Sequence, residues 1–184
     1  MRYVAFFRNV NLGQKGCPNK TGFEAAFTGC GAKWAQSFLT NGTLVFVAPS
    51  DAAARRILRA ARASLAASCG LEEPVFLRRL EQMARLVAGD PFAKVDRRGV
   101  YRFCVSFFDG KVTPRGLPRS SNRGDVEVVR LTGGELLSIV RKIGSGPGSP
   151  TLLLEQSLGR PATTRVWNTL VRLVARHHQA SCED

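Results

Sequence analysis

Residues 34–47 read WAQSFLTNGTLVFV, and this stretch decides the fold of the first half of the chain. Two apolar runs, Trp34 to Leu39 and Thr43 to Val47, flank the tripeptide Thr40-Asn41-Gly42. An Asn-Gly pair between two such runs is the strongest short-range signal for a β-hairpin. The stretch therefore predicts two antiparallel strands joined by a tight turn.

The segments on either side of the hairpin complete a β-α-β-β-α-β order over residues 1–79. This order predicts a ferredoxin-like first half. Apolar side chains at helical or strand spacing identify each segment. Ser50 marks the start of the second helix, and Gly70 marks its end. The segments are a strand from Arg2 to Val10, a helix from Asn19 or Thr21 to Gly29 or Gly31, a helix from Asp51 to about Cys69, and a strand from Val75 to Leu77.

A second, smaller α+β half is predicted to follow a break in the chain. A short helix from Glu81 to Ala88 ends at Gly89-Asp90-Pro91, which is typical of a hinge. We therefore expect subdomains at residues 1–90 and 91–184, and an α+β class for the whole chain. The predicted elements of the second half are a strand from Val100 to Phe108, a loop from Lys111 to Gly124, a strand from Val126 to Leu131, a strand or short helix from Glu135 to Lys142, and a C-terminal helix that starts near Thr163.

The sequence predicts a soluble, cytoplasmic protein. Arg or Lys interrupts every hydrophobic run, so no segment has the roughly 20 apolar residues that a membrane-spanning helix needs. The N-terminus lacks the pattern of a secretory leader. The five cysteines are widely spaced and form no C-x-x-C pair, which favours reduced thiols over disulfides or a zinc site.

The chain carries 27 basic and 14 acidic residues, a formal net charge of +13 that favours anionic partners. An Arg-rich composition typical of a GC-rich genome is the alternative explanation. Within the helix from Asp51, four arginines follow helical spacing and predict a positive stripe. We expect this stripe to contact nucleic-acid phosphates, and a solvated helix face is the alternative. The four are Arg55, Arg56, Arg59 and Arg62.

Several kinds of catalytic site are not expected. The only histidines, His177 and His178, lie near the predicted fraying end of the last helix, where an imidazole cannot serve a nucleophile. No Gly-rich loop ends in the Gly-Lys-Ser/Thr of a nucleotide-binding loop. Asp125 and Glu127 lack a third acid nearby, so they are interpreted as a solvated strand face. We expect no metal and no cofactor, and whether the protein is an enzyme stays open.

Four stretches of sequence resemble a bacterial family known as domain of unknown function 1697. They are Tyr3 to Gly13, Asn41 to Phe46 with the later Asp90-Pro91-Phe92, and Glu155 to Leu170. The last stretch contains Thr163-Thr164-Arg165, which is similar to the start of the family's C-terminal Thr-Thr-Arg-Asn-x-Asn-Thr signature, although Val166 stands where the family commonly has Asn. The resemblance implies a two-part α+β fold and no established reaction.

A candidate ligand site follows from two groups of polar residues. The first group is predicted at the start of the C-terminal helix and consists of Thr163, Thr164, Arg165 and Asn168. Free backbone N–H groups, hydroxyls and a guanidinium at such a position can bind an anion. Simple capping of the helix is the alternative. Arg8, Asn9 and Asn11 at the exit of the first strand, with Asn41 in the hairpin turn, are the second group, for which a local turn network is the alternative.

The sequence leaves three functions open. Binding of an anionic ligand is favoured, with nucleic acid placed ahead of a small phosphorylated metabolite. The third possible function is that of a module that binds only other proteins. We expect a monomer or a dimer.

Overall fold

The computed structural model describes residues 1–110, 117–144 and 146–178. Contacts divide the chain into two compact units, which are described separately. Unit 1 comprises Met1–Met83 and the residues from His177 onward, and unit 2 comprises Ala84–Arg176. Part of the loop predicted at Lys111 to Gly124, namely residues 111–116, lies outside the described residues. The predicted boundary at residue 90 stays a prediction.

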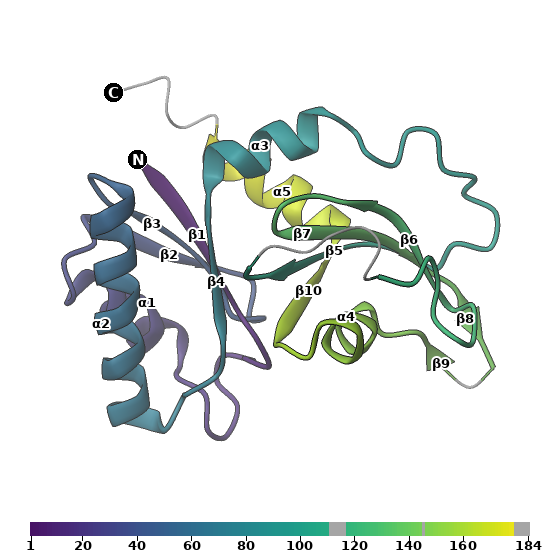
Figure 1. Cartoon of the computed structure of the whole chain (residues 1–184). Coiled ribbons are helices and arrows are strands. Elements are labelled where there is room, and N and C mark those ends of the chain that lie inside the picture. The colour runs from purple at the N-terminus through teal and green to yellow at the C-terminus, as the bar shows by residue number, and fades with distance from the viewer. Residues whose placement is uncertain (111–116, 145, 179–184) are drawn as a thin grey trace. The chain divides into compact units, whose positions relative to one another are not determined.

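Unit 1 contains a four-stranded antiparallel sheet in the order β2-β3-β1-β4. Two helices lie against one face of this sheet (Figure 1). The chain order is β-α-β-β-α-β, as the sequence predicts, and the predicted α+β class is confirmed. The elements are β1 (Arg2–Phe7), α1 (Lys20–Thr28), β2 (Trp34–Phe38), β3 (Thr43–Val47), α2 (Asp51–Cys69) and β4 (Val75–Arg79).

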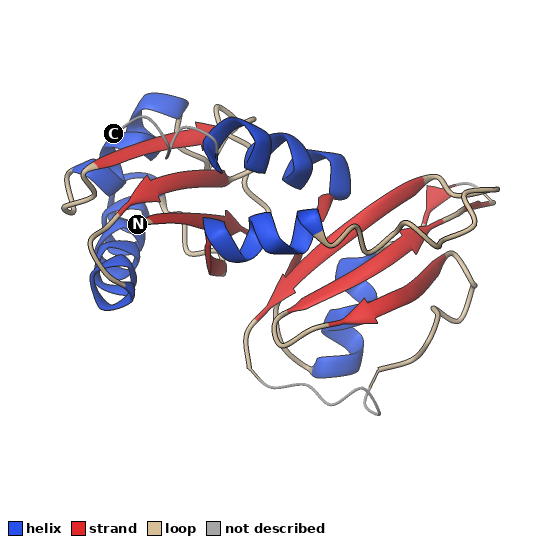
Figure 2. Ribbon diagram, turned by 90° about the horizontal axis from the view of Figure 1, so that it is seen from above, coloured by secondary structure: helices blue, strands red, loops and turns tan. Residues whose placement is uncertain are grey.

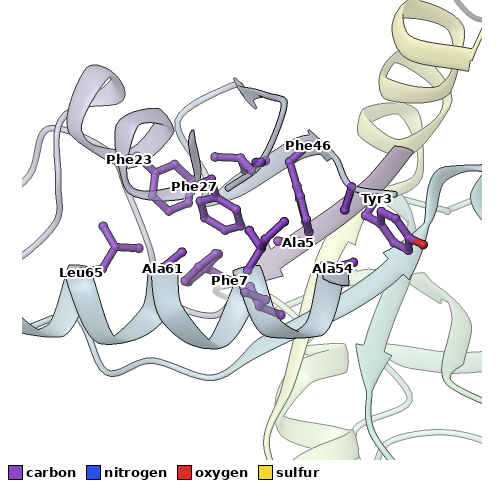
Figure 3. Close-up of a cluster of buried hydrophobic side chains, with 14 of the residues drawn as sticks. Tyr3, Ala5, Phe7, Phe23, Phe27, Phe46, Ala54, Ala61 and Leu65 are labelled. Atoms are coloured by element: carbon purple, nitrogen blue, oxygen red, sulfur yellow. The ribbon is translucent and has the colours of Figure 1, made fainter. Parts of the chain in front are cut away.

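The core of unit 1 is built mainly from aromatic side chains between the sheet and the two helices. Alternate residues of β1 point to the helical side because successive strand side chains face opposite ways. Figure 3 shows Phe7 of β1 among Phe23 and Phe27 of α1 and Phe46 of β3. The ring centroids of Phe7 and Phe23 lie 5.1 Å apart in an edge-to-face arrangement, which aromatic pairs favour.

Both ends of α2 follow local capping chemistry. Oγ of Ser50 accepts a hydrogen bond from the N–H of Ala53 at 3.2 Å, and Gly70 takes a left-handed conformation after the last turn. The inward face carries only apolar residues, including Ala54, Ala61 and Leu65. Burial of this stripe fixes the rotation of the helix, so the opposite face must lie in solvent.

Unit 2 contains a second four-stranded antiparallel sheet, in the order β10-β5-β7-β6. Helix α4 contacts β10 and β5 on one face of this sheet (Figures 1 and 2). The elements from α3 onward are α3 (Leu80–Ala88), β5 (Arg102–Phe108), β6 (Val126–Leu131), β7 (Glu135–Val140), β8 (Lys142–Ile143), β9 (Gly146–Pro147), α4 (Pro150–Leu158), β10 (Ala162–Val166) and α5 (Trp167–His178).

Each face of this sheet has its own apolar cluster. On the side of α4, Phe108, Leu136 and Ala162 pack with Leu154 of the helix. Phe92 contacts Phe103 of β5 and Trp167 of α5, with ring centroids 4.8 and 5.2 Å away. Trp167 is therefore a half-buried packing residue.

The structure corrects two predictions about the C-terminal segment. Residues 162–166 form strand β10, so the last helix starts at Trp167 and not near Thr163. The cause is pairing with β5, which places Thr164 opposite Ser106 and Arg165 opposite Val105. The second correction concerns His177, which is only 5% exposed.

His177 lies inside unit 1 instead of at a frayed end. Its ring centroid is 5.8 Å from that of Trp34 and 6.1 Å from that of Phe38, both on β2. Arg2 of β1 donates a hydrogen bond to the carbonyl oxygen of His177. This imidazole is therefore a packing residue of unit 1.

Candidate functional site

Four exposed side chains on α2 form what we call the arginine surface: Arg55, Arg56, Arg59 and Arg62. Each has its charged group in solvent, and none forms a hydrogen bond or ion pair with any described residue. The positions between them on the outer face are small, including Ala52, Ala60, Ala63 and Ser64. The four arginines of the predicted basic stripe are therefore all exposed on α2.

The only acidic residue of α2 is Asp51, and its carboxylate is already engaged. Oδ1 of Asp51 accepts hydrogen bonds from Nε of Arg79 at 2.7 Å and from the hydroxyl of Tyr3 at 2.8 Å. Oδ2 accepts a second bond from the guanidinium of Arg79. The bonds from Arg79, and then that from Tyr3, lower the pKa of Asp51 to about 2. Burial and the bond to Asp51 raise the pKa of Tyr3.

At the exit of β1, Arg8 and Asn9 both bind one carboxylate. Nη1 of Arg8 and Nδ2 of Asn9 each lie 3.3 Å from an oxygen of Glu73. Asn9 takes a left-handed φ of 51°, which aims its amide at this acid. A hollow of about 510 Å³ next to them is lined by Lys15 but also by Glu72 and Glu73. These contacts favour the turn-network interpretation of Arg8 and Asn9, because two carboxylates line the hollow.

Asn11 and Asn41 lie where the loop after β1 meets the hairpin turn. Oδ1 of Asn41 accepts a hydrogen bond from the hydroxyl of Thr43 at 2.8 Å, whereas Asn11 is exposed. The N–H of Leu12 donates to the carbonyl of Thr40 at 2.7 Å, and that of Phe7 to the carbonyl of Gly42 at 2.8 Å. The loop and the turn are thus joined by their backbones. A ligand role for the two asparagines stays a prediction.

The residues predicted at the C-terminal helix start belong instead to two faces of a strand. Thr163 and Arg165 share one face of β10, and Thr164 points to the other, because strand side chains alternate. Arg165 is 6% exposed and donates from Nη1 to Oγ1 of Thr163 at 2.8 Å. Burial lowers its pKa to about 10. Asn168 is exposed on α5. The three residues 163–165 therefore do not form a single anion site at a helix start.

Unit 2 contains a pocket of about 240 Å³ that was not predicted from the sequence. It lies where α4 begins, beside β5 and β10. The local signal was present, since Ser149-Pro150 is a typical helix start and Gly159 a typical helix end. The lining residues include Arg102, Cys104, Ser149, Thr151 and Thr164.

The described residues hold no group of three His, Cys, Asp or Glu side chains able to bind a metal ion. Asp125, interpreted from the sequence as part of a solvated face, is only 4% exposed and accepts a hydrogen bond from the hydroxyl of Ser121 at 2.6 Å. Cys17, Cys30, Cys69 and Cys104 are free thiols. Among the helices described, none has the length and apolar character needed to cross a bilayer.

Comparison with known proteins identifies the family. The family model described as "Protein of unknown function (DUF1697)" matches residues 1–137. The chain belongs to this family. The matched residues include the segment Met1–Met83 of unit 1. In unit 2 they include strands β5 and β6, and β7 as far as Leu137. The DUF1697 signature that the sequence resembles at Glu155 to Leu170 lies beyond the matched residues. A comparison with curated proteins gives no match.

One solved structure is similar along nearly the whole chain. Its title is "The structure of conserved bacterial protein SP0830 from Streptococcus pneumoniae", and it superposes with a TM-score of 0.64 at 16% sequence identity. The alignment covers 95% of this chain and 97% of that one. At this identity the likeness establishes a shared fold and carries no functional information.

Proposed function

We propose that this DUF1697 protein binds nucleic acid through the phosphate backbone, using the arginine surface of α2. The observation that carries the proposal is the exposure of four guanidinium groups without a hydrogen bond or ion pair to any described residue. Arginine suits this role because its planar fork binds phosphate oxygens in pairs. A net charge of +13 adds long-range attraction for a polyanion.

The arrangement of charges supports binding over simple solvation. A helix face that serves only solubility usually mixes Glu with Lys or Arg, since opposite charges three or four residues apart stabilise the helix. Here Arg59 lies three or four residues from Arg55, Arg56 and Arg62, so each of these three pairs is repulsive. The one opposite-charge pair at this spacing is Asp51 with Arg55, at the start of the helix. Like-charge pairs of this kind cost roughly 0.2–0.5 kcal/mol each. An anionic partner would remove this repulsion.

The small residues between the arginines favour close approach of an extended backbone. Ala52, Ala60 and Ala63 project little beyond the helix cylinder, so phosphates can reach the guanidinium groups from one side. The surface offers no exposed aromatic ring on α2 for base stacking. We therefore expect contacts to the backbone alone, with little preference for base sequence.

Two further inferences accompany the proposal. Four free thiols support a reducing compartment such as the cytoplasm. The β-α-β-β-α-β order and the all-antiparallel sheet support a ferredoxin-like classification of unit 1.

The test is the salt dependence of affinity, measured by fluorescence anisotropy with a short labelled DNA duplex and a single-stranded RNA. Replacement of Arg55, Arg56, Arg59 and Arg62 by Gln should weaken binding strongly. The slope of log K against log salt should become shallower by roughly 0.9 for each lost contact to duplex phosphate.

A matched variant separates a specific surface from general positive charge. Arg119, Arg130, Arg172 and Arg176 are exposed arginines of unit 2, and their replacement by Gln removes the same charge. This control should retain most of the affinity. Equal loss in both variants, or binding that does not fall with salt, would contradict the proposal.

A further inference from the structure

We propose that the pocket at the start of α4 binds the phosphate group of a small phosphorylated molecule. The pocket lies entirely within unit 2 and is separate from the arginine surface. Strands β5 and β10 supply its floor, and the segment that leads into α4 supplies its wall. The residues that line it are Arg102, Cys104, Val140, Pro147, Gly148, Ser149, Pro150, Thr151, Thr164 and Val166.

The charge of the lining selects an anion. Arg102 is the one ionised side chain among the lining residues, and none of these residues carries a carboxylate. The buried carboxylate of Asp125 lies behind Gly148, where a Cβ would meet its Oδ1 at 2.7 Å. Its Nη2 donates to the hydroxyl of Tyr101 at 3.0 Å, and its guanidinium carbon lies 4.6 Å from the centroid of that ring. The contacts with Tyr101 restrain the side chain and use one of five N–H donors. The remaining donors are available to a ligand.

The first turn of α4 adds a backbone donor. Oγ of Ser149 accepts from the N–H of Leu152 at 3.3 Å, and the carbonyl of Ser149 accepts from Leu153 at 3.1 Å. Pro150 has no N–H. The N–H of Thr151 has no acceptor among the described residues and belongs to a residue that lines the pocket. A helix start of this kind favours negative charge.

Three hydroxyl groups form a hydrogen-bonded chain that ends at Thr151. Oγ of Ser106 lies 2.7 Å from Oγ1 of Thr164, and that atom lies 2.8 Å from Oγ1 of Thr151. Either atom of each pair can donate. When Ser106 donates to Thr164 and Thr164 to Thr151, the hydrogen of the Thr151 hydroxyl is directed to a ligand. Thr151 then offers two donors, its N–H and its hydroxyl.

Ser138 on β7 lies on the same face of the sheet as the pocket, but it is not one of the residues that line it. Its side chain is fully buried, and its Oγ has no hydrogen-bond partner. Such a group in a native structure requires an explanation, because almost all buried hydroxyls are hydrogen-bonded. Ser138 pairs across the sheet with Cys104 and lies two residues before Val140, and both of these line the pocket. The Ser138 hydroxyl therefore points to the face of the sheet on which the pocket lies.

The dimensions limit the ligand to a small molecule. A volume of about 240 Å³ is below the roughly 300–1,000 Å³ of sites for drug-sized ligands. This volume admits a phosphate with a few further atoms and excludes a nucleic-acid strand. Gly148 packs closely against β6, since a Cβ there would approach Cγ2 of Val126 to 2.6 Å.

The pocket suits binding without covalent chemistry. Burial raises the pKa of the Cys104 thiol to about 11, so the thiol stays protonated at neutral pH. A protonated thiol is a weak donor to an anion and a poor nucleophile.

The experiment is isothermal titration calorimetry of the full chain with inorganic phosphate and with glycerol 3-phosphate. A background of about 0.5 M NaCl screens general attraction by exposed arginines. We expect saturable binding to one site. Arg102→Gln should weaken it by about tenfold or more, and Thr151→Val by about threefold to tenfold, because each removes a donor to a charged group.

The control variant is Arg119→Gln, which removes an exposed arginine of unit 2 that does not line the pocket. It should leave phosphate binding unchanged. Arg102→Gln should in turn leave the affinity for nucleic acid unchanged, so that the two proposals fail independently. Absence of saturable phosphate binding up to about 10 mM, equal effects of all three variants, or equal affinity for acetate would overturn the assignment.

Discussion

Arg79 at the end of β4 holds Asp51 at the start of α2, with Nε of the arginine 2.7 Å from Oδ1 of the aspartate. The bond has two effects. It anchors the first turn of α2 to the edge strand of the sheet. It also occupies the only carboxylate of α2, which forms no hydrogen bond with the arginine surface and has only a smaller electrostatic interaction with Arg55.

Asp51→Asn should remove part of the acid sensitivity of unfolding. The folded-state pKa of Asp51 is lowered from 3.8 to about 2. A carboxyl group with a lowered pKa contributes stability that is fully present above its unfolded pKa and is lost as pH falls through the folded value. The urea midpoint of the wild type should therefore fall more steeply than that of the variant between about pH 4 and pH 2.

Glu72→Gln provides the control for this charge change. Glu72 is exposed and forms no hydrogen bond with a described residue. The variant should retain the steep acid dependence of the wild type. If the urea midpoints of the wild type and of Asp51→Asn changed equally with pH, the ion pair would contribute nothing to folding.

Arg59→Glu should stabilise the protein while it weakens binding to nucleic acid. The new carboxylate would lie three or four residues from Arg55, Arg56 and Arg62, and each opposite-charge pair is worth roughly 0.2–0.5 kcal/mol. We expect the free energy of unfolding to rise by about 0.5–1 kcal/mol, measured by urea denaturation. Arg119→Glu makes the same change of charge away from α2 and should give no such gain. A loss of stability in Arg59→Glu would mean that the arginines support the fold and not a ligand.

Ser138→Ala and Ser106→Ala should change stability in opposite directions. Both side chains are fully buried, but only Ser106 has a hydrogen-bond partner. Loss of an unsatisfied hydroxyl should raise the free energy of unfolding by about 1 kcal/mol, and loss of a bonded hydroxyl should lower it by a similar amount. Thermal unfolding without phosphate measures both. Destabilisation of both variants would contradict the prediction.

Gly42→Ala should destabilise the protein more than Gly13→Ala does. Both glycines have positive φ, 67° and 84°, so each alanine costs about 1–2 kcal/mol of backbone strain. A Cβ at Gly42 would also lie 2.6 Å from Cβ of Val10, whereas nothing lies within 4 Å at Gly13. Chemical denaturation should show a clear excess loss in Gly42→Ala, and equal losses would mean that the hairpin turn can move away from Val10.

Local chemistry made much of unit 1 predictable. The Asn41-Gly42 pair lies in the four-residue connection between β2 and β3, in which Leu39 and Gly42 have positive φ. Ser50 and Gly70 delimit α2 through their own backbone preferences. The apolar stripe of α2 then fixes which face is buried, and this explains why the exposure of its arginines follows from spacing alone. Such features depend on neighbours in the sequence, and the sequence analysis identified them correctly.

Features that depend on distant partners were not predictable in this way. Thr163-Thr164-Arg165 has the composition of a helix cap, but pairing with β5 overrides that preference. Burial of His177 requires Trp34 and Phe38, which precede it by most of the chain. The pocket in unit 2 requires α4, two strands and a loop together, so no single stretch of sequence reveals it.

The backbone bonds between the loop after β1 and the hairpin turn limit how this protein can vary in length. Leu12 binds Thr40, and Phe7 binds Gly42. A residue inserted into either segment would shift these donors out of register with their acceptors. We therefore expect insertions to be confined to the exposed residues 13–16, and the lengths of residues 8–12 and 40–42 to change only together.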